Sequence, residues 1–328
     1  MNKSIIIHTH TYGSGGIGDF LRASLSLYSI CHRYNFDYYI NFNENEKLKE
    51  CFDIKEIPLI DNNIEYISLI GATSTENNFK PYINKFISEP KIYNIKCNLI
   101  GIESIENINK IREYYFTDIL KPTHKVIDYI DQLYQKYNII NDNYISVHVR
   151  CGDRTIDNNN SNDYRIDITN TNIIKEYKEI INKFSLEYNI NNLPIIIHSD
   201  CKYFKDELKK LENNFIYLDI DIKHIADNIG INTINGYIST IAEFYIISKA
   251  NKIFVPYEYS GFSHLASIIN NKELYIINSS EYYNLLHCNN IIKLYVNYYP
   301  LNPLVHKRTK GFLIPKIPKE FVKDKFLL

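Results

Sequence analysis

Residues 144–153 read YISVHVRCGD and lie close to the middle of the chain. Isoleucine and valine occupy every second position up to Val149, and β-branched residues with this period predict a pleated, buried strand. The pattern ends at Arg150, where the carboxyl end of the strand would lie and where open α/β sheets place their ligands. An arginine there predicts a phosphate-binding group, because its planar guanidinium offers five donors. An equally weighted interpretation is a structural ion pair between Arg150 and Asp153 at the surface.

The length and composition of the chain predict a folded protein of two domains. Its 328 residues exceed the usual size of one domain, and its 45% hydrophobic and 23% charged residues are typical of soluble globular proteins. The formal net charge is −1, from 37 Lys and Arg against 38 Asp and Glu. This balance gives no overall field to attract nucleic acid or an anionic membrane, so any anion site must be local.

The cysteines and the N-terminal sequence bear on cofactors and location. Six cysteines are scattered without a CxxC pair or a short Cys/His spacing, so we expect no metal site and no dense disulfide framework. Free thiols favour a reducing compartment. The apolar run before His8 is too short for a signal peptide or a membrane span. These features predict a cytoplasmic protein with no transmembrane segment.

The first forty residues predict a strand, a glycine-rich turn, a helix and a second strand. The first strand covers residues 5–7, the helix reaches Tyr34, and the second strand covers residues 38–42. The turn contains Gly15, Gly16 and Gly18, and its backbone amides can face an anion or a sugar. It lacks the Gly-Lys-Ser/Thr of a P-loop, and no acidic residue at a clear strand end completes a dinucleotide pattern.

We place the domain boundary in the polar turn at residues 138–143, between an N-terminal domain of residues 1–140 and a second domain of residues 141–280. The segment before this boundary is less regular, with short elements expected at residues 48–52, 65–69, 98–101, 111–120 and 123–137. Residues 281–328 contain four prolines and are expected to form an irregular tail that packs back on the domains.

In the second half strands alternate with helices, which predicts an α/β fold with a parallel sheet covered on both faces. The strands are expected at residues 194–198, 215–218, 252–256 and 274–277, and the helices at residues 173–188, 203–211, 236–248 and 264–269. Three strand ends carry polar residues and would lie on one edge of the sheet. They are His148 with Arg150, then His198, Ser199 and Asp200, and finally Ser260, Gly261, Phe262 and Ser263.

These three strand ends predict one anion-binding site. Arg150 would clamp a diphosphate, and the hydroxyl and amide groups of residues 260–263 would contact the same phosphates. His198 and Asp200 would then lie beside a base or a ribose. Two structural alternatives stay open: Ser260 as a simple helix N-cap, and His198 as a buried histidine whose hydrogen bonds are satisfied within the protein.

Three motifs resemble those of GDP-fucose-dependent fucosyltransferases. Residues 148–153, HVRCGD, resemble the H-x-R-x-G-D segment of that family, with Gly152 and Asp153 matched as well as His148 and Arg150. Residues 260–266, SGFSHLA, resemble its serine-rich phosphate loop. Residues 15–19, GGIGD, are similar to the glycine loop of its nodulation and core-type members. The motifs occur in the expected order over most of the chain.

The resemblance implies a GT-B architecture, in which two Rossmann-like domains with parallel sheets face a central cleft and the second domain holds the nucleotide sugar. It implies inversion at the anomeric carbon with no metal ion and no cofactor besides the donor, GDP-fucose or another nucleoside-diphosphate sugar. Arg150 would bind the β-phosphate and stabilise the leaving GDP. His148 would fix the nucleotide or Arg150, and Asp19 or another carboxylate of the first domain would deprotonate the hydroxyl of a glycan acceptor.

One departure and two alternatives limit what the resemblance implies. Cys151 occupies a position where relatives often carry a basic residue, which removes a second phosphate cation and leaves the donor sugar open. A heptosyltransferase-like or other nucleotide-sugar transferase would carry a similar glycine loop before a helix. A relative that binds nucleotide or glycan without turnover would share the motifs as well.

Overall fold

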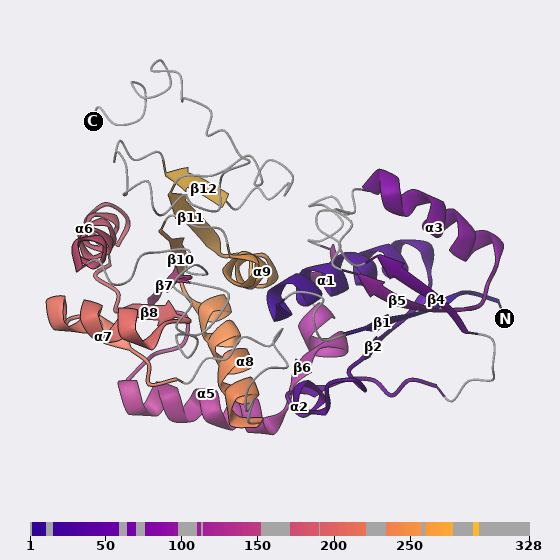
Figure 1. Cartoon of the computed structure of the whole chain (residues 1–328), viewed down its shortest axis with the longest axis horizontal. Coiled ribbons are helices and arrows are strands. Elements are labelled where there is room, and N and C mark those ends of the chain that lie inside the picture. Colours follow the sequence, from indigo (N-terminus) through magenta and orange to yellow (C-terminus); the bar gives the residue numbers. More distant parts are fainter. Residues whose placement is uncertain are drawn as a thin grey trace, which may run out of the picture.

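In the computed structural model the chain forms two α/β units that lie side by side, each built on a parallel sheet (Figure 1). The structure describes residues 2–10, 16–58, 64–69, 76–97, 110–112, 114–151, 171–189, 191–220, 234–256, 260–277 and 291–294. The first sheet belongs to the N-terminal unit, and a larger sheet forms the second unit. The prediction of an α/β fold with two parallel sheets is confirmed.

Four parallel strands form the first sheet, in the order β2-β1-β5-β4. They are β1 (Ile5–Thr9), β2 (Asp37–Asn41), β4 (Ile64–Leu69) and β5 (Ile92–Cys97). β1 lies between β2 and β5, so the strand order reverses at β1. The helix that follows β1 therefore starts at the edge where open α/β sheets bind their ligands.

Helix α1 (Ile17–Tyr34) connects β1 to β2 and is buried along most of its length. It ends at Asn35, which adopts a left-handed conformation (φ 57°) and donates its backbone N–H to the carbonyl of His32. The smaller elements of this unit are α2 (Glu46–Lys49), α3 (Glu76–Ser88) and the antiparallel pair β3 (Phe52–Asp53) and β6 (Lys121–Pro122).

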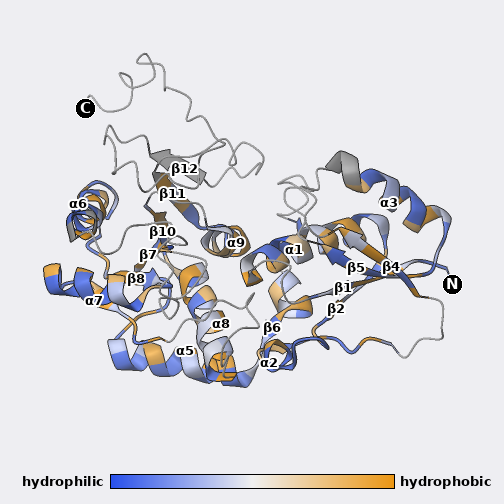
Figure 2. Ribbon diagram, viewed as in Figure 1, coloured by the Kyte–Doolittle hydropathy of each residue, from blue (hydrophilic) through white to orange (hydrophobic). Residues whose placement is uncertain are grey.

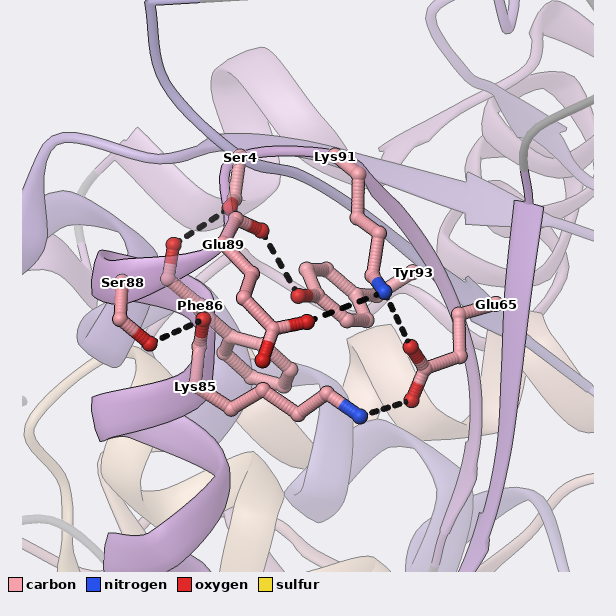
Figure 3. Close-up of polar contacts among 8 residues, drawn as sticks. All are labelled: Ser4, Glu65, Lys85, Phe86, Ser88, Glu89, Lys91 and Tyr93. Atoms are coloured by element: carbon pink, nitrogen blue, oxygen red, sulfur yellow. Dashed lines mark hydrogen bonds and ion pairs between the residues drawn. The ribbon is translucent and has the colours of Figure 1, made fainter.

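Polar contacts at the amino end of the first sheet hold α3 against the strands (Figure 3). Glu65 on β4 forms ion pairs with Lys85 of α3 and with Lys91, each at 2.6 Å. Ser4, just before β1, donates a hydrogen bond of 2.6 Å to the carbonyl of Phe86. Partly exposed ion pairs of this kind contribute little to the free energy of unfolding.

Six parallel strands form the second sheet, in the order β12-β11-β10-β7-β8-β9. They are β7 (Ile145–Val149), β8 (Ile195–Ser199), β9 (Ile216–Tyr217), β10 (Lys252–Val255), β11 (Glu273–Ile277) and β12 (Ile291–Leu294). Counted from β7 and read from β9 to β12, this is the order 3-2-1-4-5-6 of doubly wound nucleotide-binding sheets. The order reverses between β7 and β10, so their carboxyl ends form the switch point.

Helices cover both faces of the second sheet. α6 (Thr171–Tyr188) and α7 (Lys202–Leu211) pack on the face to which β7 sends its valines. α8 (Ile234–Lys249) and α9 (Gly261–Ile269) lie on the other face, toward which Ser146 and His148 point. α7 carries a hydrophilic and a hydrophobic side (Figure 2), whereas α8 is buried along nearly its whole length. The alternation in β7 thus separates apolar packing from polar contacts.

The two units share part of their hydrophobic core. α1 packs against α9 and α2 against α8, and Phe116 lies 5.9 Å from Phe244 of α8 between ring centroids. Helix α5 (His124–Tyr137) also packs against α8, and Tyr137 OH accepts a hydrogen bond of 2.9 Å from the backbone N–H of Asp219. The contact of α1 with α9 brings the helix starts at the two switch points together (Figure 1).

Most expected elements appear close to their predicted bounds, but several segments differ. The sequence does not predict α3, because Pro81 interrupts its pattern. The strand expected at residues 98–101 lies outside the described residues, and β5 comes just before it. A single π-helical turn, η1 (Tyr115–Ile119), replaces part of the helix expected at residues 111–120. The irregular tail is wrong for residues 291–294, which form β12. The domain boundary at residue 140 stays a prediction.

Candidate active site

The carboxyl ends of β7 and β10 are neighbours at the switch point of the second sheet, because Phe254 of β10 pairs with Val147 of β7. Arg150 directly follows β7, and Ser260 lies between β10 and α9. β8 flanks β7 on its other side, in parallel register. The three polar strand ends that the sequence singles out therefore meet on one edge of the sheet, as predicted.

Asp200 lies close to Arg150 at this edge. Arg150 Nε lies 4.0 Å from Asp200 Oδ2, and the Arg150 side chain is 20% exposed. The other carboxylate oxygen, Oδ1, accepts a hydrogen bond of 2.7 Å from the backbone N–H of Cys151. Asp200 therefore lies beside the guanidinium, and part of the Arg150 side chain is accessible to solvent. An arginine in this setting can bind an anion at the sheet edge.

His148 is a buried, neutral histidine beside Arg150. Its ring lies 5.9 Å from that of Phe262 on α9. Burial lowers the pKa of His148 to about 3, with smaller contributions from His198 and Arg150, so the ring is uncharged near neutral pH. The side chain is 4% exposed, and its Nδ1 has no hydrogen-bond partner among the residues that the structure describes. A buried polar atom of this kind costs about 1–3 kcal/mol unless a ligand or water satisfies it.

His198, the neighbour of His148 in the sheet, has both ring nitrogens engaged. Nε2 lies 3.1 Å from Ser146 Oγ, and Nδ1 lies 3.1 Å from Glu243 Oε1 on α8. All three side chains are buried. This is the arrangement of the structural alternative, and it leaves neither ring nitrogen for a nucleotide. Ser199 is likewise engaged, since its Oγ accepts a hydrogen bond of 3.2 Å from the N–H of Cys201.

The start of α9 presents backbone amides and a buried serine to the switch point. Ser260 is the N-cap residue, but its side chain forms no cap hydrogen bond. The residue is 3% exposed, and its Oγ has no hydrogen-bond partner within the described ranges. Ser263 Oγ, one turn on, donates to the carbonyl of Ser260 at 3.4 Å. Amides and hydroxyl at a helix start suit a phosphate, because the positive end of the helix dipole lies there.

The start of α1 lies against the start of α9. A Cβ added to Gly18 would lie 2.8 Å from the backbone N of Phe262, so the close approach of the two helices requires a glycine. Asp19 is 40% exposed and forms an ion pair with Arg22, one turn further along α1. Arg22 is a residue that the sequence interpretation missed. Its spacing of three from Asp19 was the available signal, but its contact with α9 is visible only in the fold.

The remaining predicted residues belong to the glycine loop and to the segment that follows Arg150. Gly16 is the N-cap residue of α1, with no side chain to cap it. Gly15, Gly152 and Asp153 lie outside the described residues. Within the described part of the chain, no three His, Cys, Asp or Glu side chains form a group suited to a metal ion. No helix in that part is long and apolar enough to cross a membrane.

Solved structures of several fucosyltransferases have a similar fold. A variant of Arabidopsis thaliana FUT1 in complex with GDP matches with a TM-score of 0.53 and 12% identity, over 84% of this chain and 70% of that chain. NodZ α-1,6-fucosyltransferase soaked with GDP-fucose matches with a TM-score of 0.53 and 16% identity, over 81% and 92%. NodZ from Bradyrhizobium gives a TM-score of 0.51 at 15% identity, over the same shares.

At this level of identity the likeness concerns the fold. The chain has the two-sheet GT-B fold of these glycosyltransferases, and the predicted GT-B architecture is confirmed. No family model matches the sequence, and no curated protein matches it either.

Proposed function

We propose that the protein is a glycosyltransferase that uses a nucleoside-diphosphate sugar, most simply GDP-fucose, and transfers the sugar to a hydroxyl group of a glycan or similar acceptor. The observation that supports this proposal is the pairing of β7, which Arg150 follows, with β10, the strand before α9, at the switch point of the second sheet. Solved structures of the same fold come from crystals grown with GDP or soaked with GDP-fucose, which supports this choice of donor.

The diphosphate of the donor would lie between Arg150 and the amides of α9. Arg150 would stabilise the negative charge that develops on the leaving nucleoside diphosphate, and the helix amides would share that charge. Ser260 Oγ and His148 Nδ1 would gain the hydrogen-bond partners that the described residues do not give them. In this proposal the arginine and the helix start take the place of a metal ion.

The acceptor would be activated from the first unit. Asp19, at the start of α1 and 40% exposed, is our candidate for the base that accepts the proton of the acceptor hydroxyl. The acceptor oxygen would attack the anomeric carbon from the face opposite the diphosphate, while the bond between that carbon and the phosphate oxygen breaks. One sugar–oxygen bond would form and one would break, with inversion and with the electron pair leaving on the diphosphate.

A thermal-shift panel of GDP, UDP, ADP and CMP tests the nucleotide first. A ligand that binds only the folded chain raises Tm by mass action, so the matching nucleotide should give the largest shift. We expect GDP to give it. A larger shift with ADP or UDP would move the assignment to another donor class, such as that of a heptosyltransferase-like enzyme.

Turnover is tested separately with GDP-fucose and a panel of other sugar nucleotides, by release of the nucleoside diphosphate. Release from GDP-fucose above the buffer rate is the expected result. Calorimetric binding of GDP with no consumption of any sugar nucleotide would instead identify a binding protein.

A further inference from the structure

Arg22 is a buried arginine at the contact between the two units. It lies on α1 with its side chain 7% exposed, and it forms an ion pair with Asp19. Its guanidinium lies against Gly261, the first residue of α9, where an added Cβ would be 2.9 Å from Arg22 Cζ and 3.0 Å from Nε. Arg22 of the first unit thus places a positive charge at the start of α9 in the second unit.

The surroundings of Arg22 suit an anionic ligand. The buried hydroxyl of Ser260, next to Gly261, lacks a hydrogen-bond partner within the described residues. His264, on α9, adds no charge, because burial and the charge of Arg22 lower the pKa of His264 to about 3. Burial raises the pKa of the Cys151 thiol beside Arg150, so this side chain is uncharged as well. A diphosphate carries more than one negative charge, and Arg150 supplies one positive charge.

We propose that Arg22 is a second cation for the donor diphosphate, and that the diphosphate and the Asp19 carboxylate compete for it. This inference rests on the proposed function. A buried guanidinium needs a close anion, and its planar fork can bind either a carboxylate or a phosphate. When the phosphates bind the guanidinium of Arg22, Asp19 is released from its ion pair and can accept a proton from the acceptor hydroxyl. Donor binding would then prepare the base.

Calorimetric titration of the whole chain with GDP tests the competition through a double-mutant cycle. Arg22→Gln should raise the Kd for GDP about tenfold, as expected for loss of a charge-assisted contact to phosphate. Asp19→Asn should lower the Kd about threefold, because the rival anion is gone. In the Arg22→Gln background, Asp19→Asn should leave the Kd unchanged, since there is no cation left to compete for.

Two controls separate this role from a purely structural one. Arg33→Gln removes an exposed arginine at the other end of α1 and should leave the Kd for GDP unchanged. Guanosine, which lacks the phosphates, should bind the wild type and Arg22→Gln equally well. If Arg22→Gln does not fold, Arg22→Lys keeps the charge without the fork and should weaken GDP binding by a smaller factor. The tighter binding of Asp19→Asn is measurable in either case.

The outcomes distinguish this inference from the function on which it rests. Wild-type chain that does not bind GDP contradicts the choice of nucleotide in the proposed function. Wild-type chain that binds GDP while folded Arg22→Gln binds it equally well overturns the role of Arg22 alone. Weaker GDP binding in Asp19→Asn, with Arg22 present or absent, would show that Asp19 supports the site and does not compete for Arg22.

Discussion

A group of polar side chains at the carboxyl edge of the first sheet and two side chains at the carboxyl edge of the second sheet differ in their hydrogen bonds. At the first edge, Thr9 Oγ1 donates to Asn94 Oδ1 at 2.8 Å and accepts from Asn41 Nδ2 at 3.2 Å, so these side chains satisfy one another. At the second edge, His148 Nδ1 and Ser260 Oγ are buried without a hydrogen-bond partner among the described residues. His148 and Ser260 both lie at the start of α9, and this favours the second edge as the place where a polar ligand completes the structure.

The same contrast separates two histidines on neighbouring strands. His148 and His198 are paired in the register of β7 and β8, and both are buried. Ser146 and Glu243 hold the ring of His198, whereas no described residue bonds His148 Nδ1. Equal residue types at equal depth therefore serve different purposes, and the hydrogen-bond partners decide which is structural.

The largest expected effect comes from removing the cation at the second edge. Arg150→Ala should slow the consumption of GDP-fucose at least about a hundredfold, because loss of one group that stabilises developing charge has an effect of this size. The rate at which the purified chain releases GDP from GDP-fucose measures this effect. Arg33→Ala, an exposed arginine on α1, is the matched control and should keep the wild-type rate. Wild-type turnover in Arg150→Ala would overturn the assignment of this edge.

A second test compares the two paired histidines. His198→Ala should lower the free energy of unfolding by about 3 kcal/mol, since the buried side chains of Glu243 and Ser146 lose their hydrogen bonds to His198. His148→Ala opens a similar cavity without breaking such bonds and should destabilise less, while weakening GDP binding more. Urea unfolding and calorimetry measure the two quantities. Equal effects of both variants on both quantities would remove the distinction.

A third test addresses the contact of α1 with α9. A methyl group at Gly18 meets the backbone of Phe262, whereas one at Gly261 meets the movable side chain of Arg22. Gly18→Ala should therefore destabilise the chain by about 1–3 kcal/mol, as overpacking commonly does. Gly261→Ala should cost less stability and act mainly on GDP binding by displacing Arg22. Thermal unfolding with and without GDP checks both, and a harmless Gly18→Ala would contradict the tight approach of the helices.

A last test uses the pH dependence of stability, to which buried histidines at both edges contribute. Burial lowers the pKa of His8, His148 and His264 to about 3 and that of His10 to about 4. The unfolded chain takes up these protons below about pH 6.5, so stability should fall as the pH drops from there toward the folded pKa values. Each histidine adds at most roughly 1.4 kcal/mol per pH unit to this slope.

His148→Gln provides the check on that slope. It should flatten the dependence of the urea midpoint on pH between about pH 6.5 and about pH 5 by the share of one histidine. An unchanged slope in this variant would mean that His148 is protonated in the folded chain.

Much of the second unit could be predicted from the sequence, because its strands and helices alternate with clear hydrophobic periods. That alternation predicted a parallel sheet, and a parallel sheet brings Arg150, Asp200 and Ser260 to one edge. The first unit was harder, since Pro81 lies inside α3. In the second unit, the four-residue strand β12 has too little pattern to be recognised.

Side-chain partnerships were beyond the sequence. The roles of His148 and His198 depend on Glu243 and Phe262, which come from helices far along the chain. The sequence did not single out Arg22 for the same reason, because the proposed role of Arg22 depends on its contact with Gly261. Hydrophobic periodicity predicts which residues are buried, but it does not predict which buried residues contact one another.

The pairing of β7 with β10 has a consequence for how the protein is made. Ile145 and Lys252 are adjacent in the sheet although more than a hundred residues separate them in the chain. Such long-range pairing is slow, and β8 and β9 are synthesised and can join β7 well before β10 exists. The edge that joins Arg150 to Ser260 should therefore be completed late in folding. Binding of a nucleotide there would report that a newly made chain has closed its second sheet.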